Sequence, residues 1–160
     1  MSSKITAKKA SVRASQKSIL LVDDDPSVRE MIGRVLAAEG YLVLTASNGA
    51  EALGVAASNR IDLVLLDLNM PVKGGWDTFA ELTSKDPLLA VVIITAKPNQ
   101  LFTSLGAGVG ALLEKPLDFP ILLRTVSALL AESAQLRLAR LTGHSVDFHY
   151  LPSRGKEHRG

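Results

Sequence analysis

The sequence has no cysteine among its 160 residues, which excludes disulfide bonds and any site built on thiolates. It also has no apolar stretch of the roughly 18 residues that a membrane-spanning helix needs. The first residues are basic but lack the apolar run and small-residue cleavage site of a secretory signal. With 47% apolar and 21% charged residues, the chain is expected to form one globular domain without membrane contact, and a cytoplasmic location fits the lack of cysteine.

Charge is distributed unevenly along the chain. Residues 1–17 hold five Lys or Arg and no acid, residues 18–134 hold eight bases and fourteen acids, and residues 135–160 hold five bases and two acids. The acidic central segment is predicted to be the folded domain. Both basic segments lack sustained apolar periodicity, so we interpret them as solvated, flexible tails, with nucleic-acid contact as the alternative.

Short apolar runs alternate with segments of helical periodicity, which is the pattern of a parallel sheet covered by helices on both faces. The predicted strands span residues 19–22, 41–45, 61–66, 89–95 and 111–114. A helix is expected after each strand. The last of them is placed to extend through Leu136, Leu138 and Leu141 as far as Gly143, with disorder beyond it.

The fourth predicted helix has a weak pattern. Gly106, Gly108 and Gly110 fall within or just after it, and a glycine in a helix interior costs about 0.8 to 1 kcal/mol relative to alanine. We therefore expect this helix to be short or irregular.

Polar residues stand where four of the predicted strands end. Asp23 and Asp24 follow the first strand, and Asp67 follows the third. Thr95 closes the fourth strand, and Lys115 follows the fifth. Because parallel strands of an open α/β sheet end on one rim, where such sheets build their sites, these side chains are expected to converge there.

Three converging carboxylates need compensation. Two carboxylates about 4 Å apart repel each other by roughly 4 kcal/mol at an effective dielectric constant of 20, so the cluster requires a cation or raised pKa values. Oxygen ligands without His or Cys favour Mg²⁺, and Lys115 adds a second positive charge. A carboxylate, a divalent metal, a hydroxyl and a lysine are the groups that phosphoryl transfer to an aspartate would use.

Taken singly, these residues also have structural interpretations. Asp25 before Pro26 is expected to cap a helix. Thr95 could simply end a strand, and Lys115 before a proline could belong to a surface turn. The three histidines have no metal-binding spacing and are interpreted as solvated; they are His144, His149 and His158. It is the joint occurrence of the rim residues in this order that favours a site.

These residues resemble the receiver domain of two-component response regulators. The resemblance rests on Asp23-Asp24 after a strand, the segment 65–71 (Leu-Leu-Asp-Leu-Asn-Met-Pro), Thr95-Ala96 and Lys115-Pro116. It implies that residues 18–134 form a receiver domain with a flavodoxin-like, doubly wound, five-stranded parallel sheet of order 2-1-3-4-5 and five helices.

The resemblance also implies a role for each matched residue. Asp67 would be the phospho-acceptor. Asp24 and Asp67 would bind Mg²⁺ directly together with the backbone carbonyl of Asn69, and Asp23 would be an outer ligand. Thr95 would bind a phosphoryl oxygen, and Lys115 would pair with the phosphoryl group, so the chain is expected to be a phospho-acceptor with partly self-catalysed chemistry rather than a conventional enzyme.

The chain departs from the family pattern at the switch position. Receivers usually carry an aromatic residue or His three positions before the lysine, where this chain has Leu112. Leu112 has no ring edge or hydroxyl to expose or hide. The segment from Thr95 to Lys115 is also slightly shorter than in familiar members. Both differences concern the output of the signal rather than the phosphorylation chemistry.

The leading hypothesis is a stand-alone receiver that takes phosphate from a sensor histidine kinase or a histidine phosphotransfer protein and signals through protein contact. Residues 135–160 are too few for a winged-helix or helix-turn-helix domain, so DNA binding is not expected. The alternatives are a degenerate receiver acting as a constitutive interaction module and a basic-tailed nucleic-acid binder. A small-molecule phosphohydrolase is disfavoured because Asn69 stands where a second Asp would be expected. Asn69 and Lys97 lie where access of the hydrolytic water would be set.

Overall fold

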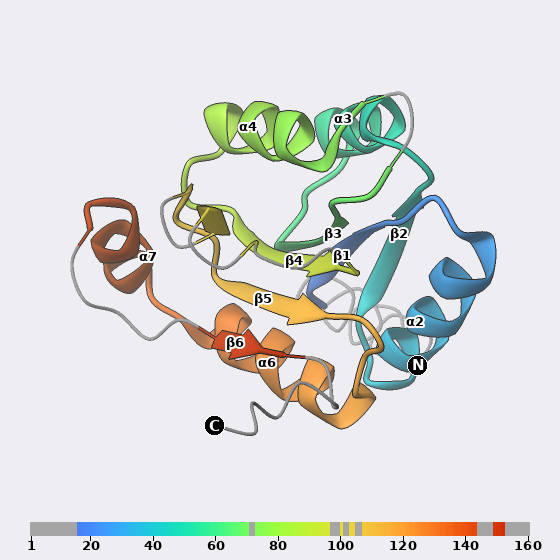
Figure 1. The fold of residues 1–160 in the computed structure, drawn as a ribbon. Helices are drawn as coiled ribbons and strands as arrows, with labels where there is room; N and C mark the ends of the chain where they lie inside the picture. The colour runs from blue at the N-terminus through green and yellow to red at the C-terminus, as the bar shows by residue number, and fades with distance from the viewer. Residues whose placement is uncertain are drawn as a thin grey trace, which may run out of the picture.

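The protein is described by a computed structural model over residues 16–70, 73–96, 100, 103–104, 107–143 and 149–152. Its strands form one parallel sheet of order β2-β1-β3-β4-β5-β6 (Figure 1). The strands are β1 (Ser18–Val22), β2 (Leu42–Ala46), β3 (Leu63–Asp67), β4 (Ala90–Thr95), β5 (Ala111–Glu114) and β6 (His149–Leu151). The helices are α2 (Pro26–Ala38), α3 (Gly49–Ser58), α4 (Gly75–Lys85), α6 (Phe119–Ala131) and α7 (Ala134–Leu141). The predicted flavodoxin-like class and the strand order 2-1-3-4-5 are confirmed.

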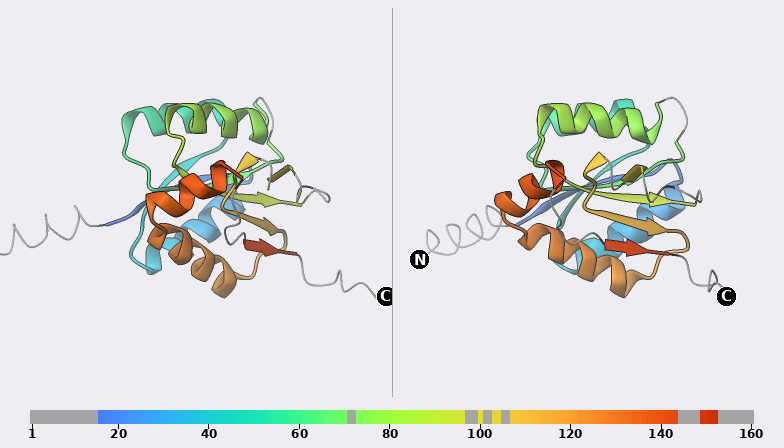
Figure 2. Two further views of the ribbon diagram at one scale, coloured as in Figure 1. Left: turned by 90° about the vertical axis from the view of Figure 1, so that its left-hand side faces the viewer. Right: turned by 60° about the vertical axis from the view of Figure 1, so that its left-hand side comes forward.

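The helices cover both faces of the sheet. Figures 1 and 2 show α3 and α4 on one face, the α3/α4 face, and α2 and α6 on the other, the α2/α6 face. Successive residues of a strand point to opposite faces, so each central strand supplies two cores. Ile19 and Leu21 pack under α2 and α6, whereas Leu20 and Val22 pack under α3 and α4. Burial on both faces explains why the strands are almost continuously apolar.

Local signals start the two helices that flank the site. Asp25 caps α2: its Oδ1 accepts the backbone N–H of Ser27 at 2.8 Å, and a proline occupies the first turn. Asp118 caps α6 by accepting the N–H of Ile121 at 3.1 Å. Both caps lie at the same rim as the strand ends, and the capping role predicted for Asp25 is the one it has.

The structure adds a sixth strand that the sequence pattern did not predict. Residues 149–151 pair in parallel with β5, with Leu112 beside Tyr150 and Leu113 beside Leu151. The expectation of disorder throughout the chain beyond Gly143 was therefore wrong for this segment. A three-residue strand carries too little alternation to be recognised, and it forms because β5 offers an unpaired edge.

The residues expected to extend the last helix form a separate helix instead. α6 ends at Ala131, and Ser133 caps α7 by accepting the N–H of Leu136. Arg137 then donates to the carbonyls of Leu88 and Leu129, and Arg140 pairs with Glu132 at 2.7 Å. Leu136, Leu138 and Leu141 stay 42–55% exposed, so arginine contacts rather than leucine burial hold α7 against the end of α6.

Some predictions fall outside the described residues. They concern the amino-terminal tail up to residue 15, the end of the chain from residue 153, most of the fourth predicted helix, Lys97, His144 and His158. Within the part of the chain that the structure describes, no helix has both the length and the apolar character that crossing a bilayer requires.

Gly75 is a steric requirement of the fold beside Asp67. A Cβ at this position would lie 2.6 Å from Leu68 Cα and 2.9 Å from the carbonyl oxygen of Asp67. Because backbone atoms cannot give way cheaply, we expect Gly75→Ala to lower the free energy of unfolding by about 2 to 3 kcal/mol. Gly54→Ala is the control, because a Cβ at this position meets nothing within 4 Å. It should raise the free energy of unfolding by about 0.5 to 1 kcal/mol. Urea denaturation of both variants tests this, and a Gly75→Ala protein as stable as the wild type would contradict it.

Candidate functional site

The structure brings three carboxylates together at the carboxyl end of the sheet. Asp23 directly follows β1, Asp67 is the last residue of β3, and these strands are neighbours. Carboxylate oxygens of Asp23, Asp24 and Asp67 all lie within 4.8 Å of one another. Asp23 is 1% exposed and Asp67 is 2% exposed, whereas Asp24 is exposed. Asp23 and Asp67 are thus buried, and Asp24 faces solvent.

Lys115 supplies positive charge to this cluster. Its Nζ lies 3.1 Å from Asp23 Oδ2 and 3.4 Å from Asp67 Oδ2. The side chain is 25% exposed, so the ammonium bridges two buried acids while it keeps contact with solvent. Lys115 follows β5 directly, and β4 fixes its backbone, because the N–H of Lys115 donates to the carbonyl of Thr95 at 2.8 Å. The Lys115–Pro116 bond is cis.

Backbone groups hold the two buried carboxylates in place. Asp67 Oδ1 accepts the N–H of Asn69 at 2.9 Å, and Asp23 Oδ1 accepts the N–H of Asp25 at 2.9 Å. Arg29 on α2 donates through Nη1 to the backbone carbonyl of Asp23 at 2.7 Å. Sequence reasoning missed Arg29. Its side chain reaches back from the first turn of α2 to a main-chain carbonyl, and such a contact leaves no sequence motif.

Thr95 and Leu112 occupy different surroundings. Thr95 ends β4, and the Thr95 side chain is fully buried. β4 neighbours β3, with Ile94 in register with Asp67. Leu112 is 1% exposed and belongs to the core of the α3/α4 face. The structure therefore places Thr95 at the end of the strand beside Asp67, whereas Leu112 is a core residue of β5 and not part of the acidic cluster.

Burial and charge shift the pKa values of the two central groups. Burial raises the pKa of Asp67 above its usual value, and the Asn69 N–H and Lys115 counter this only in part. Burial alone would lower the pKa of Lys115, but its bonds and charge interactions with Asp23 and Asp67 outweigh that effect and raise it. Burial thus destabilises the ionised form of Asp67, and a further cation beside it would stabilise that form.

The raised pKa of Lys115 predicts a loss of stability in alkaline solution. The folded state holds this proton more tightly than the unfolded chain, so the stabilisation is present below the ordinary pKa of 10.5 and disappears as pH rises through the higher folded value. Urea denaturation at about pH 9 and about pH 11.5 should show a larger loss for wild type than for Lys115→Met. Equal losses in the two proteins would contradict the prediction.

The donor set fits a hard divalent cation. Lys115 pairs with the two buried carboxylates of a cluster of three, so one lysine faces three acids and negative charge remains in excess. All ligand atoms are oxygens, and Asp24 keeps the cluster open to water. Mg²⁺ prefers a few carboxylates and retains several waters, which matches this arrangement better than a softer metal.

Comparison with protein families decides what kind of domain this is. The family model of the response regulator receiver domain matches residues 19–127, a span that includes all of the rim residues described above. The chain belongs to the response regulator receiver family. Receivers are signalling modules rather than classical enzymes.

Related sequences are longer than this receiver. It is 38% identical over 118 residues to the transcriptional regulatory protein GlrR of Escherichia coli, covering 72% of this chain and 27% of that protein. It is 37% identical over 134 residues to the response regulator MprA of Mycobacterium bovis, covering 78% of this chain and 58% of that protein. The receiver thus spans between about a quarter and three fifths of these relatives.

Solved structures agree with this assignment. A CheY-like receiver domain protein from Methanospirillum hungatei matches with a TM-score of 0.70 and 28% identity, over 72% of this chain and 94% of that one. The response regulator TrrA of Thermotoga maritima, solved in complex with Mg(2+)-BeF, matches with a TM-score of 0.66 and 35% identity, over 71% of this chain and 99% of that one.

Proposed function

We propose that this receiver is phosphorylated on Asp67 in a Mg²⁺-dependent reaction and transmits the signal through contact with another protein. The observation that carries the proposal is the placement of Asp67, which is buried at the end of β3 between the Lys115 ammonium and the Asn69 N–H. Asp23 and Asp24 stand beside it. A nucleophile, a counter-charge and a cation site thus meet at one carboxylate.

The residues that would hold Mg²⁺ are Asp24, Asp67 and the backbone carbonyl of Asn69, with Asp23 as an outer ligand. When bound, Mg²⁺ supplies positive charge against the oxygens of the phosphoryl group. The Mg(2+)-BeF complex of the relative from Thermotoga maritima supports this proposal.

In the transfer step a carboxylate oxygen of Asp67 attacks phosphorus. The new bond joins that oxygen to phosphorus, and the bond from phosphorus to the donor nitrogen of a phosphohistidine breaks. The electron pair stays on the imidazole, so atoms and charge balance. Lys115, already 3.4 Å from Asp67 Oδ2, would follow the charge onto a phosphoryl oxygen, and the Thr95 hydroxyl would donate to another.

The donor would be a sensor histidine kinase or a histidine phosphotransfer protein, the classes that phosphorylate receivers. The relative from Escherichia coli is a transcriptional regulatory protein, but this chain covers only 27% of it, so no role in transcription is proposed here. Burial of Leu112 in the core leaves a specific second candidate. A receiver without a mobile ring at this position could act as a constitutive interaction module.

Beryllofluoride with Mg²⁺, a mimic of the phosphoryl group, separates the two functions. Amide NMR of the full chain should show shifts at the acidic cluster that extend through β5 toward its neighbours if the receiver switches. Shifts confined to the residues around Asp67 would favour the constitutive module. A spectrum that does not change at saturating beryllofluoride would contradict phosphorylation at this site. Mg²⁺ without beryllofluoride serves as the control for cation binding alone.

A further inference from the structure

The sixth strand lies directly against the end of β5 that carries the site lysine. β6 pairs with Ala111, Leu112 and Leu113, and only Glu114 separates this paired stretch from Lys115. A three-residue strand has few backbone bonds, and it belongs to the part of a fold that opens at low free energy. Its docking can therefore respond to small changes in β5.

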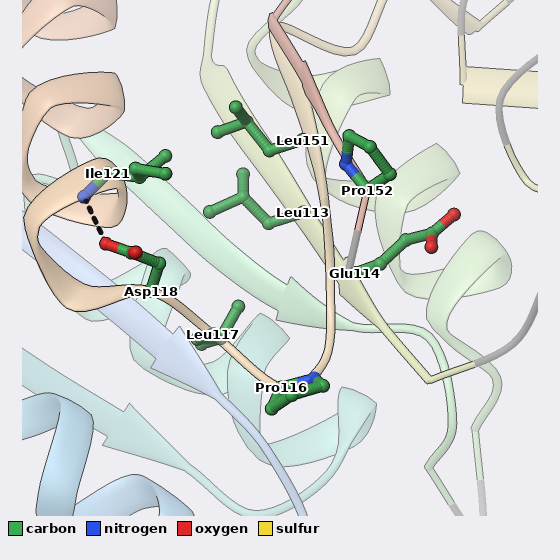
Figure 3. A pocket seen from close by; sticks show the side chains of 8 residues that line it. All are labelled: Leu113, Glu114, Pro116, Leu117, Asp118, Ile121, Leu151 and Pro152. Atoms are coloured by element: carbon green, nitrogen blue, oxygen red, sulfur yellow. Dashed lines mark hydrogen bonds between the residues drawn. The ribbon is translucent and has the colours of Figure 1, made fainter. Parts of the chain in front are cut away.

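Residues 114–118, called here the β5–α6 loop, run from the last residue of β5 to the residue that caps α6, and they have the site on one side and β6 on the other. Lys115 reaches Asp23 and Asp67. Figure 3 shows the other side, a pocket of about 200 Å³ between this loop, the start of α6 and the end of β6. Its lining includes Leu113, Asp118, Ile121 and Leu151. In this view Leu151 and Leu113 point toward the first turn of α6, beside Ile121.

One polar contact ties β6 to this loop. The Tyr150 hydroxyl donates to Glu114 Oε1 at 2.9 Å, and Glu114 directly precedes Lys115. Leu151 adds an apolar contact, because it packs against the core of the α2/α6 face. The register also pairs Tyr150 with Leu112 on the neighbouring strand. A tyrosine from the end of the chain thus neighbours the position that lacks an aromatic residue.

We infer that docking of β6 and occupancy of the acidic cluster are positively coupled through residues 114–118. This inference rests on the proposed function. β6 restrains the loop from one side, and a ligand held by Lys115 restrains it from the other. The element that binds first orders the loop for the second, so each strengthens the other. By reciprocity both effects have the same size. When β6 leaves β5, the open edge of β5 can accept an extended peptide. The coupling means that β6 covers this edge more completely in the liganded state.

Hydrogen exchange of the unmodified full chain tests the coupling without any variant. The probe is beryllofluoride with Mg²⁺ at saturation. The amide of His149, which donates to the carbonyl of Gly110 directly before β5, should exchange about fivefold more slowly with the probe than with Mg²⁺ alone, at the low end of typical coupling factors. Unchanged exchange in β6, while amides near Asp67 respond, would overturn the inference and leave the proposed function intact. No response near Asp67 either would overturn both.

The reciprocal effect is measured on a variant that loosens β6. Leu151→Asp places a carboxylate beside the apolar side chains of Leu113 and Ile121, and it should weaken beryllofluoride binding by about fivefold. Leu138→Asp is the matched control, because Leu138 is 55% exposed on α7; its affinity should equal that of wild type. Equal affinities in all three proteins would overturn the coupling.

Discussion

Replacing Asp67 with Asn should abolish phosphorylation. Wild-type protein incubated with acetyl phosphate and Mg²⁺ should gain about 80 Da per phosphoryl group, and Asp67→Asn should gain none, since an amide oxygen cannot act as the attacking nucleophile. The variant should fold, because Asn keeps an oxygen that can accept the Asn69 N–H and removes a buried charge whose pKa is raised by burial. Intact-mass spectrometry measures the result.

Asp25→Asn is the matched control for this experiment. Asp25 lies two residues from the buried Asp23, but its side chain caps α2, and Asn caps a helix as well as Asp does. The control should gain mass like the wild type. A full mass gain in Asp67→Asn would show that the acceptor lies elsewhere. Loss of the mass gain in Asp25→Asn would show that negative charge near the rim, rather than the Asp67 nucleophile, governs the reaction.

Replacing Lys115 with Met should impair both folding and phosphoryl transfer. Without the ammonium, the buried Asp23 and Asp67 lose their shared counter-charge. Breaking a buried pair costs 3 to 5 kcal/mol; because Lys115 is a quarter exposed, we expect a loss of about 2 kcal/mol in the free energy of unfolding. The rate of labelling by acetyl phosphate should fall by about 10² to 10³. Urea denaturation and a time course of intact mass measure the two effects.

Lys85→Met, the same substitution on the exposed end of α4, controls for the loss of one positive charge. It should leave the labelling rate unchanged. A Lys115→Met protein that folds and labels like this control would show that Lys115 contributes nothing beyond general charge.

The sheet and the convergence of the carboxylates were predictable because both depend on short-range signals. Each central strand is a continuous apolar run between turn residues, and parallel pairing brings the ends of β1 and β3 to one rim. Asp67 was identified because a buried strand ends on a carboxylate. Asp25 was interpreted as a cap from its place before Pro26, and the structure confirms it.

The features that sequence reasoning missed depend on contacts between distant segments. β6 exists only because β5 has a free edge, and its three residues have no pattern of their own. The sequence pattern predicts α7 as a continuation of α6, because helical periodicity continues across the break at which Ser133 caps α7. Arg29 reaches Asp23 through a main-chain carbonyl, which any residue could offer. The sequence showed that Leu112 was atypical, but its burial became clear only once both faces of the sheet were assembled.

The most direct test of phosphorylation at Asp67 is tandem mass spectrometry of the full chain after incubation with acetyl phosphate and Mg²⁺. The added group should be found on Asp67, and chelation of Mg²⁺ should prevent its appearance. A phosphoryl group on another residue, or no added group under conditions that label a known receiver, would contradict the assignment of Asp67 as the acceptor.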